Sequence, residues 1–271
     1  MKRFLLILTL LISLFFLYAR FINTTGLDVK EFSIESTTIP KTFDGFKIVH
    51  FSDILFGSTT NIETIKNMVK KINNTNPDLI VFTGDLISKD KSINDEEKNE
   101  IIEELKKLKS TTNKYAVMGD NDQKDISLYK EIMDNSKFTL LDNKSSYLFF
   151  KDINPIKIIG INDEESLDTL LKNEEGINPT FTLALTHKSD NINFLKDKQI
   201  DVILSGNSLG GQIRIPFIGG IIKKEGSLTY IDSYYEVNNT KLYVSNGIGT
   251  EKIKLRSFNT PSINEYRINI K

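Results

Sequence analysis

The stretch "DLIVFTGDL" at residues 78–86 decides the fold. Its consecutive apolar residues, Leu79 to Phe82, show no alternation with polar residues, which is typical of a strand buried on both faces of a sheet. Asp85 follows soon after this strand, at the edge where open α/β sheets place their ligands. The stretch therefore predicts a buried central strand with a carboxylate near its carboxyl end.

Similar apolar runs recur along the chain, and segments with helical apolar spacing separate several of them. The further runs are "FKIVHF" (46–51), "KYAVMG" (114–119), "IKIIGI" (156–161), "TFTLALTH" (180–187), "DVILSG" (201–206) and "KLYVSNG" (241–247). Helical patterns cover 62–72 and 100–108, and the charged stretch 89–98 is expected to be a solvated loop or a helix start. This alternation predicts an α/β body with layered sheets.

Composition excludes several classes of function. The 271 residues form one large domain or two small ones, and a hydrophobic content of 39% is enough for a core. Because 35 basic residues balance 36 acidic ones, no nucleic-acid partner is expected. The absence of cysteine excludes disulfides and thiolate metal sites. Only His50 and His187 offer imidazoles, and His50 lies within an apolar strand, where we expect it to pack in the core.

The N-terminal segment predicts membrane association. Phe4 to Ala19 is almost entirely apolar and follows Lys2 and Arg3. No A-x-A cleavage pattern follows it, so an uncleaved single-pass anchor is preferred over a cleaved signal peptide. The basic N-terminus favours a cytoplasmic start and a globular domain on the extracytoplasmic side of the membrane. The expected division is an anchor at 1–22, a tether with an edge strand at 23–44, and one globular domain at 45–271.

Polar side chains follow successive buried strands at the point where each strand ends. They are Asp53, Asp85, Asp120, Asp122, His187 and Asn207. Each one alone is explained by a turn or a helix cap. Their ordered recurrence after consecutive strands predicts that they share one site at the carboxyl edge of the sheets.

The motifs that contain these residues resemble those of the calcineurin-like metallophosphoesterases, most closely the membrane-associated bacterial branch. The matching stretches, in order, are "SD", "DLIVFTGDL", "YAVMGDND", "LALTHKSD", "LSGNSLGGQIRIP" and "LYVSNGIGT". The resemblance covers about residues 46–268. It implies a four-layer β-sandwich flanked by helices, with two divalent ions bridged by an aspartate at one edge. Such ions hold a phosphate, generate hydroxide from water and stabilise the leaving oxygen.

The resemblance assigns roles residue by residue and also reveals losses. Asp53 falls on the first ligand position, Asp85 on the bridging position and His187 on a ligand position of the second metal. This sequence departs from the family motifs at five positions. Leu55 replaces the histidine of D-x-H, and Asp120 replaces the asparagine of G-N-H-D. Asn121 replaces the histidine that assists the leaving group, and Asn207 and Leu209 replace the two histidines of G-H-x-H.

These losses predict a degenerate centre. Leucine has no lone pair, so Leu55 and Leu209 leave the first metal without half of its ligands. Asn121 does not titrate and is no general acid. The retained cleft loop, consisting of Gly206, Gly210, Gly211, Gln212 and Arg214, indicates that the loop keeps its shape.

Charge balance predicts a compensating cation. Asp53, Asp85 and Asp120 are expected to lie close together, and like charges raise one another's pKa values. One hard cation, Mn²⁺, Mg²⁺ or Ca²⁺, is expected at most, held by residual ligands among Asp53, Asp85, Asp120, His187 and Asn207. Lys188 is an alternative source of positive charge if no ion binds.

Two functions compete on these grounds. The first is a membrane-anchored pseudoenzyme that binds a phosphate-containing envelope ligand or a protein in the old cleft. The second is a weak hydrolase with a single metal at Asp85, Asp120, His187 and Asn207, acting on a phosphodiester or a phospholipid-type substrate. A purely structural envelope protein is a third reading, favoured if side chains fill the cleft.

Overall fold

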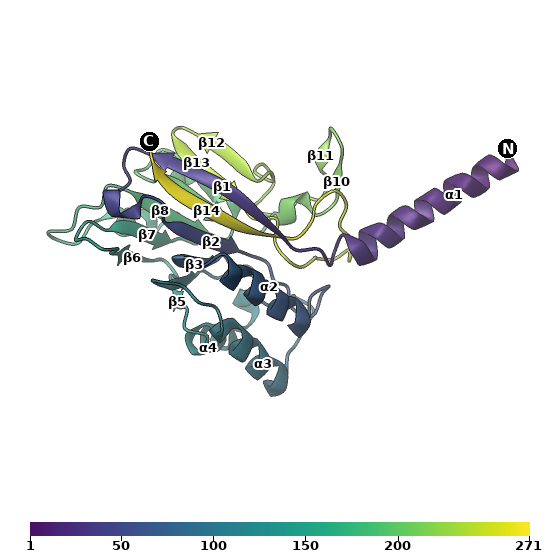
Figure 1. The fold of residues 1–271 in the computed structure, drawn as a ribbon, viewed down its shortest axis with the longest axis horizontal. Helices are drawn as coiled ribbons and strands as arrows, with labels where there is room; N and C mark the ends of the chain where they lie inside the picture. The colour runs from purple at the N-terminus through teal and green to yellow at the C-terminus, as the bar shows by residue number, and fades with distance from the viewer.

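Two six-stranded sheets form the body of the computed structural model, which describes all residues 1–271 (Figure 1). The first sheet has the order β1 (Asp28–Ser36), β14 (Ser262–Ile270), β2 (Lys47–Phe51), β3 (Leu79–Phe82), β4 (Lys114–Ala116) and β5 (Thr139–Leu140). The second has the order β12 (Tyr234–Val237), β13 (Thr240–Val244), β9 (Val202–Ser205), β8 (Thr182–Thr186), β7 (Ile156–Gly160) and β6 (Lys144–Leu148). A separate hairpin pairs β10 (Arg214–Ile215) with β11 (Gly219–Gly220).

Helices cover the outer faces of both sheets. The first sheet is covered by α2 (Ile62–Asn74), α3 (Asp95–Lys106) and α4 (Ile126–Asn135), and the second by α5 (Leu167–Leu171) and α6 (Ile192–Leu195). The predicted four-layer sandwich is therefore confirmed. The helix predicted at 100–108 begins earlier, because the Asn94 side chain accepts a hydrogen bond from the backbone N–H of Glu97 at 2.8 Å and caps it.

The apolar runs bury both faces of each central strand. In β3, Leu79 and Val81 point into the core between the two sheets, whereas Ile80 and Phe82 point into the core beneath α2–α4. Alternate residues of a strand face opposite sides of the sheet, so a strand covered on both sides needs apolar residues at every position. This is the physical reason why residues 79–82 show no alternation.

The strand directions place one set of loops at a common edge. β2, β3 and β4 run parallel in the first sheet, and β7, β8, β9 and β13 run parallel in the second. The loops that follow β2, β3, β4, β8 and β9 carry the polar residues identified in the sequence. The predicted site residues are therefore delivered to the carboxyl ends of the strands.

The N-terminal helix α1 (Lys2–Leu17) projects away from this body and leads through a π-helical turn (Tyr18–Ile22) into the first sheet (Figure 1). Residues Lys2–Ile22 form one helix that is long and apolar enough to cross a membrane, with a mean hydropathy of 2.4. β1 pairs with β14 along its whole length, so residues 28–36 form the edge of the first sheet. The domain boundaries at 22 and 44 remain a prediction.

His50 is part of the core rather than of the site. Its ring is fully buried, with Nε2 2.8 Å from Thr83 Oγ1 and Nδ1 3.3 Å from the hydroxyl of Tyr266. Burial lowers the pKa of His50 from 6.5 to about 3. The folded protein therefore keeps this ring neutral at pH values at which the unfolded chain protonates it.

We predict that His50 contributes to acid sensitivity. Because its folded pKa lies below its unfolded pKa, stability is lost as the pH falls from 6.5 towards 3, by about 2 kcal/mol at pH 5. Urea unfolding of the detergent-solubilised protein at pH 7.5 and pH 5 should show a smaller loss for His50→Gln than for the parent. Equal losses in the two proteins would mean that His50 does not titrate on unfolding.

Candidate metal centre

Asp53, Asp85 and His187 meet at the common edge of the two sheets. They follow β2, β3 and β8, and one ligand atom from each lies within 4.8 Å of the others. All three side chains are buried. Two carboxylates and an imidazole in this arrangement form a candidate site for a divalent cation.

The backbone at the ligand positions is held in an unusual conformation. Asp53, Leu55, Asp85, Asn207 and Leu209 all have φ values between 50° and 64°, in the left-handed region. For residues other than glycine, this region costs roughly 1–2 kcal/mol per residue. The loops therefore keep a strained backbone at these positions, including the two that carry leucine.

Glycines allow the loops to approach the carboxylates closely. A Cβ at Gly206 would lie 1.9 Å from Ser52 Oγ and 2.7 Å from Asp53 Oδ2. A Cβ at Gly119 would lie 2.3 Å from Asp85 Oδ1. Any larger residue at either position would therefore displace a carboxylate of the site.

His187 presents its second ring nitrogen to the site. Its Nδ1 lies 2.6 Å from the carbonyl oxygen of Thr83 and donates to it, while its Nε2 lies 3.5 Å from Asp85 Oδ2. Asp85 also accepts hydrogen bonds from the backbone N–H of Asn121 at 2.8 Å and from its side-chain amide at 3.1 Å. An imidazole anchored in this way is oriented as a metal-ligating histidine is.

The buried polar atoms without a hydrogen-bond partner include Asp53 Oδ1, His187 Nε2 and Asn207 Oδ1, and also Ser52 Oγ next to Asp53. The Asn207 amide nitrogen donates to the carbonyl of Glu225 and to Ser227 Oγ, so its oxygen is the free end. Buried acceptors without partners are costly and require an explanation. When His187 is neutral, these atoms and Asp85 fit the donor set of one cation, whereas a protonated His187 cannot act as a ligand.

A second cation does not fit. Leu55 and Leu209 are fully buried, and they pack against Gly249 and Gly247, where added Cβ atoms would each lie 2.6 Å from a leucine side chain. Asp120 lies outside the buried group, because its carboxylate is half-exposed and pairs with Lys188 Nζ at 3.0 Å. The donor set thus supports one ion at most.

Lys224 is the residue that the sequence did not reveal. Its Nζ lies 3.7 Å from Asp85 Oδ2 and 3.2 Å from Glu251 Oε2, and its side chain is only 15% exposed. In the sequence it follows Lys223 in a polar loop, a pattern typical of solvated lysines. The expected compensating lysine, Lys188, is instead paired with Asp120. Only the fold brings the loop after β11 over the carboxylates.

The charges of the centre compensate one another. Burial alone would raise the pKa of Asp85, but the His187 and Lys224 charges outweigh it and hold this pKa at about 2. Burial lowers the pKa of His187, and Asp85 and Asp53 outweigh this effect and raise it to about 9. Burial likewise opposes the charge of Lys224, yet Asp53, Asp85 and Glu251 raise its pKa. Burial raises the pKa of Asp53. At neutral pH, Asp85 therefore faces two cationic side chains.

Asp122 organises the turn beneath Asp85. Its carboxylate accepts hydrogen bonds from the backbone N–H groups of Asp85 and Gly119, each at 2.8 Å, and of Leu86 at 3.0 Å. Burial and the nearby charge of Asp85 raise the pKa of Asp122 to about 7. The second acid of "GDND" thus has a structural role, which its position after a strand could not distinguish from that of a ligand.

Hydrogen bonds and close backbone contacts within the chain hold the cleft loop in its shape. Gln212 donates to the carbonyl of Leu255 at 3.0 Å, and Arg214 donates to the carbonyl of Gly210 at 3.0 Å. The Gly211 backbone passes so close to Gly220 that an added Cβ would lie 2.5 Å from its Cα. Gln212, Arg214 and the glycines therefore maintain the loop and do not contribute ligands.

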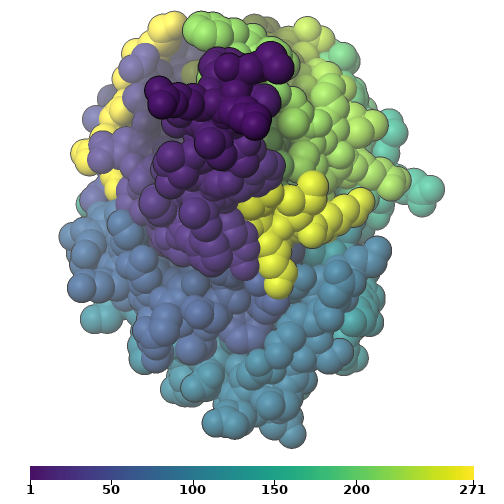
Figure 2. Space-filling model, turned by 90° about the vertical axis from the view of Figure 1, so that its right-hand side faces the viewer, coloured from purple at the N-terminus to yellow at the C-terminus, as the bar shows by residue number.

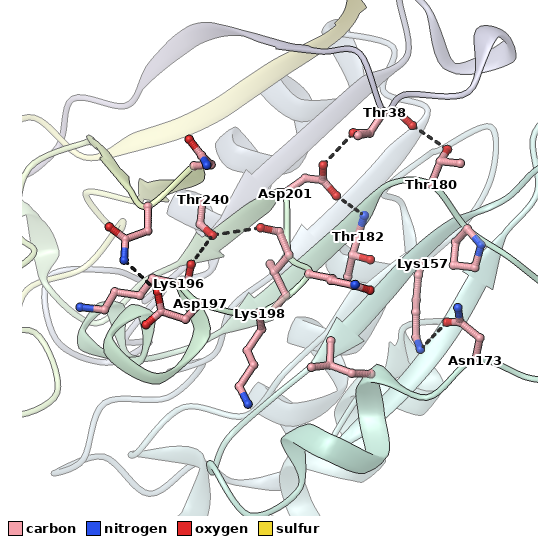
Figure 3. A pocket seen from close by; sticks show the side chains of 16 residues that line it. Thr38, Lys157, Asn173, Thr180, Thr182, Lys196, Asp197, Lys198, Asp201 and Thr240 are labelled. Atoms are coloured by element: carbon pink, nitrogen blue, oxygen red, sulfur yellow. Dashed lines mark hydrogen bonds between the residues drawn. The ribbon is translucent and has the colours of Figure 1, made fainter.

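A cavity of about 250 Å³ opens beside His187, Lys188 and Asp120. A larger cavity of about 520 Å³ lies at the opposite edge, where the strands of the second sheet begin (Figure 3). There Asp201 accepts hydrogen bonds from Thr38 Oγ1 at 2.7 Å and from the backbone N–H of Thr182 at 2.8 Å. Because its central carboxylate is satisfied within the chain, the larger cavity offers no comparable ligand set.

Comparisons with known proteins agree with this geometry. The sequence profile of the calcineurin-like phosphoesterases matches residues 46–208. The uncharacterized metallophosphoesterase YkuE of Bacillus subtilis is 31% identical over 93% of this chain and 88% of YkuE. The UDP-2,3-diacylglucosamine pyrophosphatase LpxG of Chlamydia muridarum is 27% identical over 83% of this chain and 85% of LpxG. The sulfate thiohydrolase SoxB of Thermus thermophilus shares the fold, with a TM-score of 0.51 and 10% identity over 85% of this chain and 57% of SoxB.

We predict that Lys224→Met destabilises the protein strongly. Removing the ammonium leaves the buried Asp53 and Asp85 carboxylates poorly compensated, which should lower the free energy of unfolding by about 2–4 kcal/mol. Lys223→Met is the matched control, because its exposed side chain should change stability by less than about 0.5 kcal/mol. Denaturant unfolding in chelator would measure both. Equal stabilities of the two variants would show that Lys224 does not compensate the site.

Proposed function

Because the chain belongs to the calcineurin-like phosphoesterase family, we propose that it is a membrane-anchored member that binds a phosphate-containing ligand and has lost two-metal hydrolysis. One observation carries this proposal: the ammonium of Lys224 lies against Asp85, the carboxylate that bridges the ions in the family pattern. A tethered cation there supplies charge but has no open coordination position for a water or a phosphate oxygen. The positive charge of a metal centre is thus retained at the site, whereas its ability to activate water and to bind a phosphate oxygen is not.

The loss of ligands supports the same conclusion. Two-metal hydrolysis requires two ions that share one aspartate and together hold the attacking and leaving oxygens. The buried Leu55 and Leu209 offer no donor at two of those positions. Asn121 stands where the leaving group would be protonated, and its amide nitrogen instead lies 3.1 Å from Asp85 Oδ2. A side-chain amide does not ionise near neutral pH, so Asn121 cannot serve as the general acid.

The cavity beside the centre suits a phosphate group. Its lining includes Gln123, Asn162, His187, Lys188 and Asn191. The Lys188 ammonium, which pairs with Asp120 at 3.0 Å in the same cavity, and the exposed Gln123 amide are the donors available to phosphate oxygens. The side-chain amides of Asn162 and Asn191 already donate to Asp142 and Thr186. Two relatives have names that state a phosphate chemistry, the UDP-2,3-diacylglucosamine pyrophosphatase LpxG and the Escherichia coli phosphodiesterase YaeI. These features support a phosphate-containing ligand of the cell envelope.

The unpartnered acceptors favour a second candidate, a weak hydrolase with a single metal. Asp53, Asp85 and His187 would hold that ion. Asn207 is next to them, because its backbone N–H donates to Asp53 Oδ2 at 3.0 Å, and its side-chain oxygen has no partner. A bound divalent ion would supply Lewis acidity and lower the pKa of water. Lys224 competes with such an ion for the same carboxylates, so ion binding and the ammonium position are linked.

Membrane anchoring is part of the proposal. Residues Lys2–Ile22 would remain as an uncleaved single-pass anchor, and Lys2 and Arg3 favour a cytoplasmic N-terminus. The globular domain would then lie on the extracytoplasmic side. This location suits a ligand of the envelope better than a cytoplasmic metabolite.

We predict that the parent protein binds at most one Mn²⁺ ion, weakly, and that Lys224→Met binds Mn²⁺ about tenfold or more tightly, because a competing cation is removed. Isothermal calorimetry of both proteins, with Lys223→Met as control, tests this. Hydrolysis of bis(p-nitrophenyl) phosphate with Mn²⁺ should stay at the level of the Asp85→Asn variant. Tight binding of two ions by the parent, or turnover that Asp85→Asn abolishes, would instead establish a hydrolase.

We also predict that the centre can be restored, since the backbone keeps the strained shape of the ligand positions. The variant combines Lys224→Met with Leu55→His, Asp120→Asn, Asn121→His, Asn207→His and Leu209→His. It should bind about two Mn²⁺ ions and gain modest phosphodiesterase activity, limited by groups that no longer orient the ligands. A folded variant that binds no Mn²⁺, judged by circular dichroism and calorimetry, would show that these positions do not converge.

A further inference from the structure

Exposed apolar side chains gather at the end of the body from which α1 projects. They are Ile215, Phe217, Ile218 and Ile221 in the β10–β11 hairpin, and Ile253 and Phe258 in the segment that follows β13. Phe217, at the hairpin turn, is completely exposed. Aromatic and branched side chains left in water next to one another mark a surface that has a partner.

Direct contacts join this surface to the root of α1. The backbone N–H of Arg256 donates to the carbonyl of Ala19 at 3.0 Å, and the rings of Phe15 and Phe258 lie 6.5 Å apart. The backbone N–H of Arg214 donates to the carbonyl of Ser257 at 2.9 Å. The hairpin is therefore linked to α1 through residues 256–258. In Figure 1 the hairpin rises beside the root of α1, and Figure 2 shows yellow C-terminal residues against the purple helix.

Basic residues accompany the apolar ones. Lys252 and Lys254 are exposed on either side of Ile253, and Lys223 is exposed two residues beyond Ile221. Apolar side chains interleaved with lysines are typical of segments that lie in the interface of an anionic bilayer, with the apolar groups among the acyl chains and the ammonium groups among the headgroups.

We propose that the β10–β11 hairpin and residues 252–258 form a second membrane contact, seated in the surface of an anionic bilayer beside α1. The inference rests on α1 lying in the membrane, as the proposed function requires. The partner of this surface is identified by its connection to α1. If α1 spans the bilayer, its C-terminal end and the residues that contact that end must lie at the lipid surface. The two segments thus hold the body upright on the membrane instead of leaving it on a loose tether.

Other exposed apolar residues lack this setting. Ile153 is also highly exposed, but it lies between β6 and β7, where parallel strands of the second sheet begin. That edge is opposite to the one that carries the site. Ile153 therefore provides a matched reference, an exposed isoleucine far from α1 on the same protein.

The second contact also bears on the site. Arg256 is fully buried and donates to the carbonyls of Gly249 and Asn246, and Asn259 donates to the carbonyl of Leu209 at 2.6 Å. The segment that touches the membrane therefore also supports the cleft loop. Membrane contact holds the site edge of both sheets at the bilayer surface.

The cysteine-free chain permits a direct test. Full-length Phe217→Cys, Ile153→Cys and Leu10→Cys variants are labelled with an environment-sensitive fluorophore and reconstituted into phosphatidylglycerol-containing vesicles. At Phe217 we expect acrylamide quenching at least threefold weaker than at Ile153, and quenching by spin-labelled lipids that is absent at Ile153. Phe217 is fully exposed, so its replacement leaves the core intact.

The Leu10 probe separates the two proposals. If Leu10 is protected by lipid and Phe217 is as accessible to acrylamide as Ile153, the second contact does not exist although the anchor does. If Leu10 is not protected, the anchor itself fails. Protection of Phe217 that disappears as the vesicle-to-protein ratio rises would mean that a second copy of the chain covers the hairpin, which would also overturn the inference.

Discussion

The buried carboxylates of Asp53 and Asp85 constrain the rest of the site. Two acids that follow adjacent parallel strands and are sealed from water cannot both ionise unless positive charge is close. The chain supplies His187 from β8 and Lys224 from the loop after β11. Glu251 in turn forms an ion pair with Lys224. The backbone N–H of Glu251 donates a hydrogen bond to the side-chain oxygen of Gln212 at 2.9 Å, which fixes its position. The arrangement of several loops thus follows from one need for charge compensation.

The backbone shape of the motif loops does not depend on which side chains the ligand positions carry. A leucine gains nothing from a left-handed conformation, yet Leu55 and Leu209 both adopt it. Their surroundings impose it: the carbonyl of Leu209 accepts a hydrogen bond from Asn259, and the backbone N–H of Leu55 donates to the carbonyl of Asp85 at 3.0 Å. Loop shape is determined by many backbone contacts, whereas coordination depends on single side chains. Substitution can therefore remove coordination and leave the shape.

The sequence predicted the features that depend on local pattern. The unbroken apolar run 79–82 indicated a strand covered on both faces, and the polar residues at strand ends indicated where Asp53, Asp85 and His187 would meet. Lys224 was not predictable, because its partner Asp85 is distant in the sequence and its own loop has the composition of solvated surface. The same limit hid the structural role of Asp122, whose backbone partners are defined only once two loops have packed together.

Strand direction accounts for the shared location of the candidate site and of the N-terminal helix. β1 enters the sheet directly after α1 and runs parallel to β14, and β14 runs antiparallel to β2. The first residue of β1 therefore lies at the edge where β2 ends and Asp53 follows. A chain that entered the sheet in the opposite direction would place its anchor beside the cavity at Asp201 instead. Because β1 runs antiparallel to the strands that deliver the ligands, the N-terminal helix and the candidate site occupy the same edge of the body.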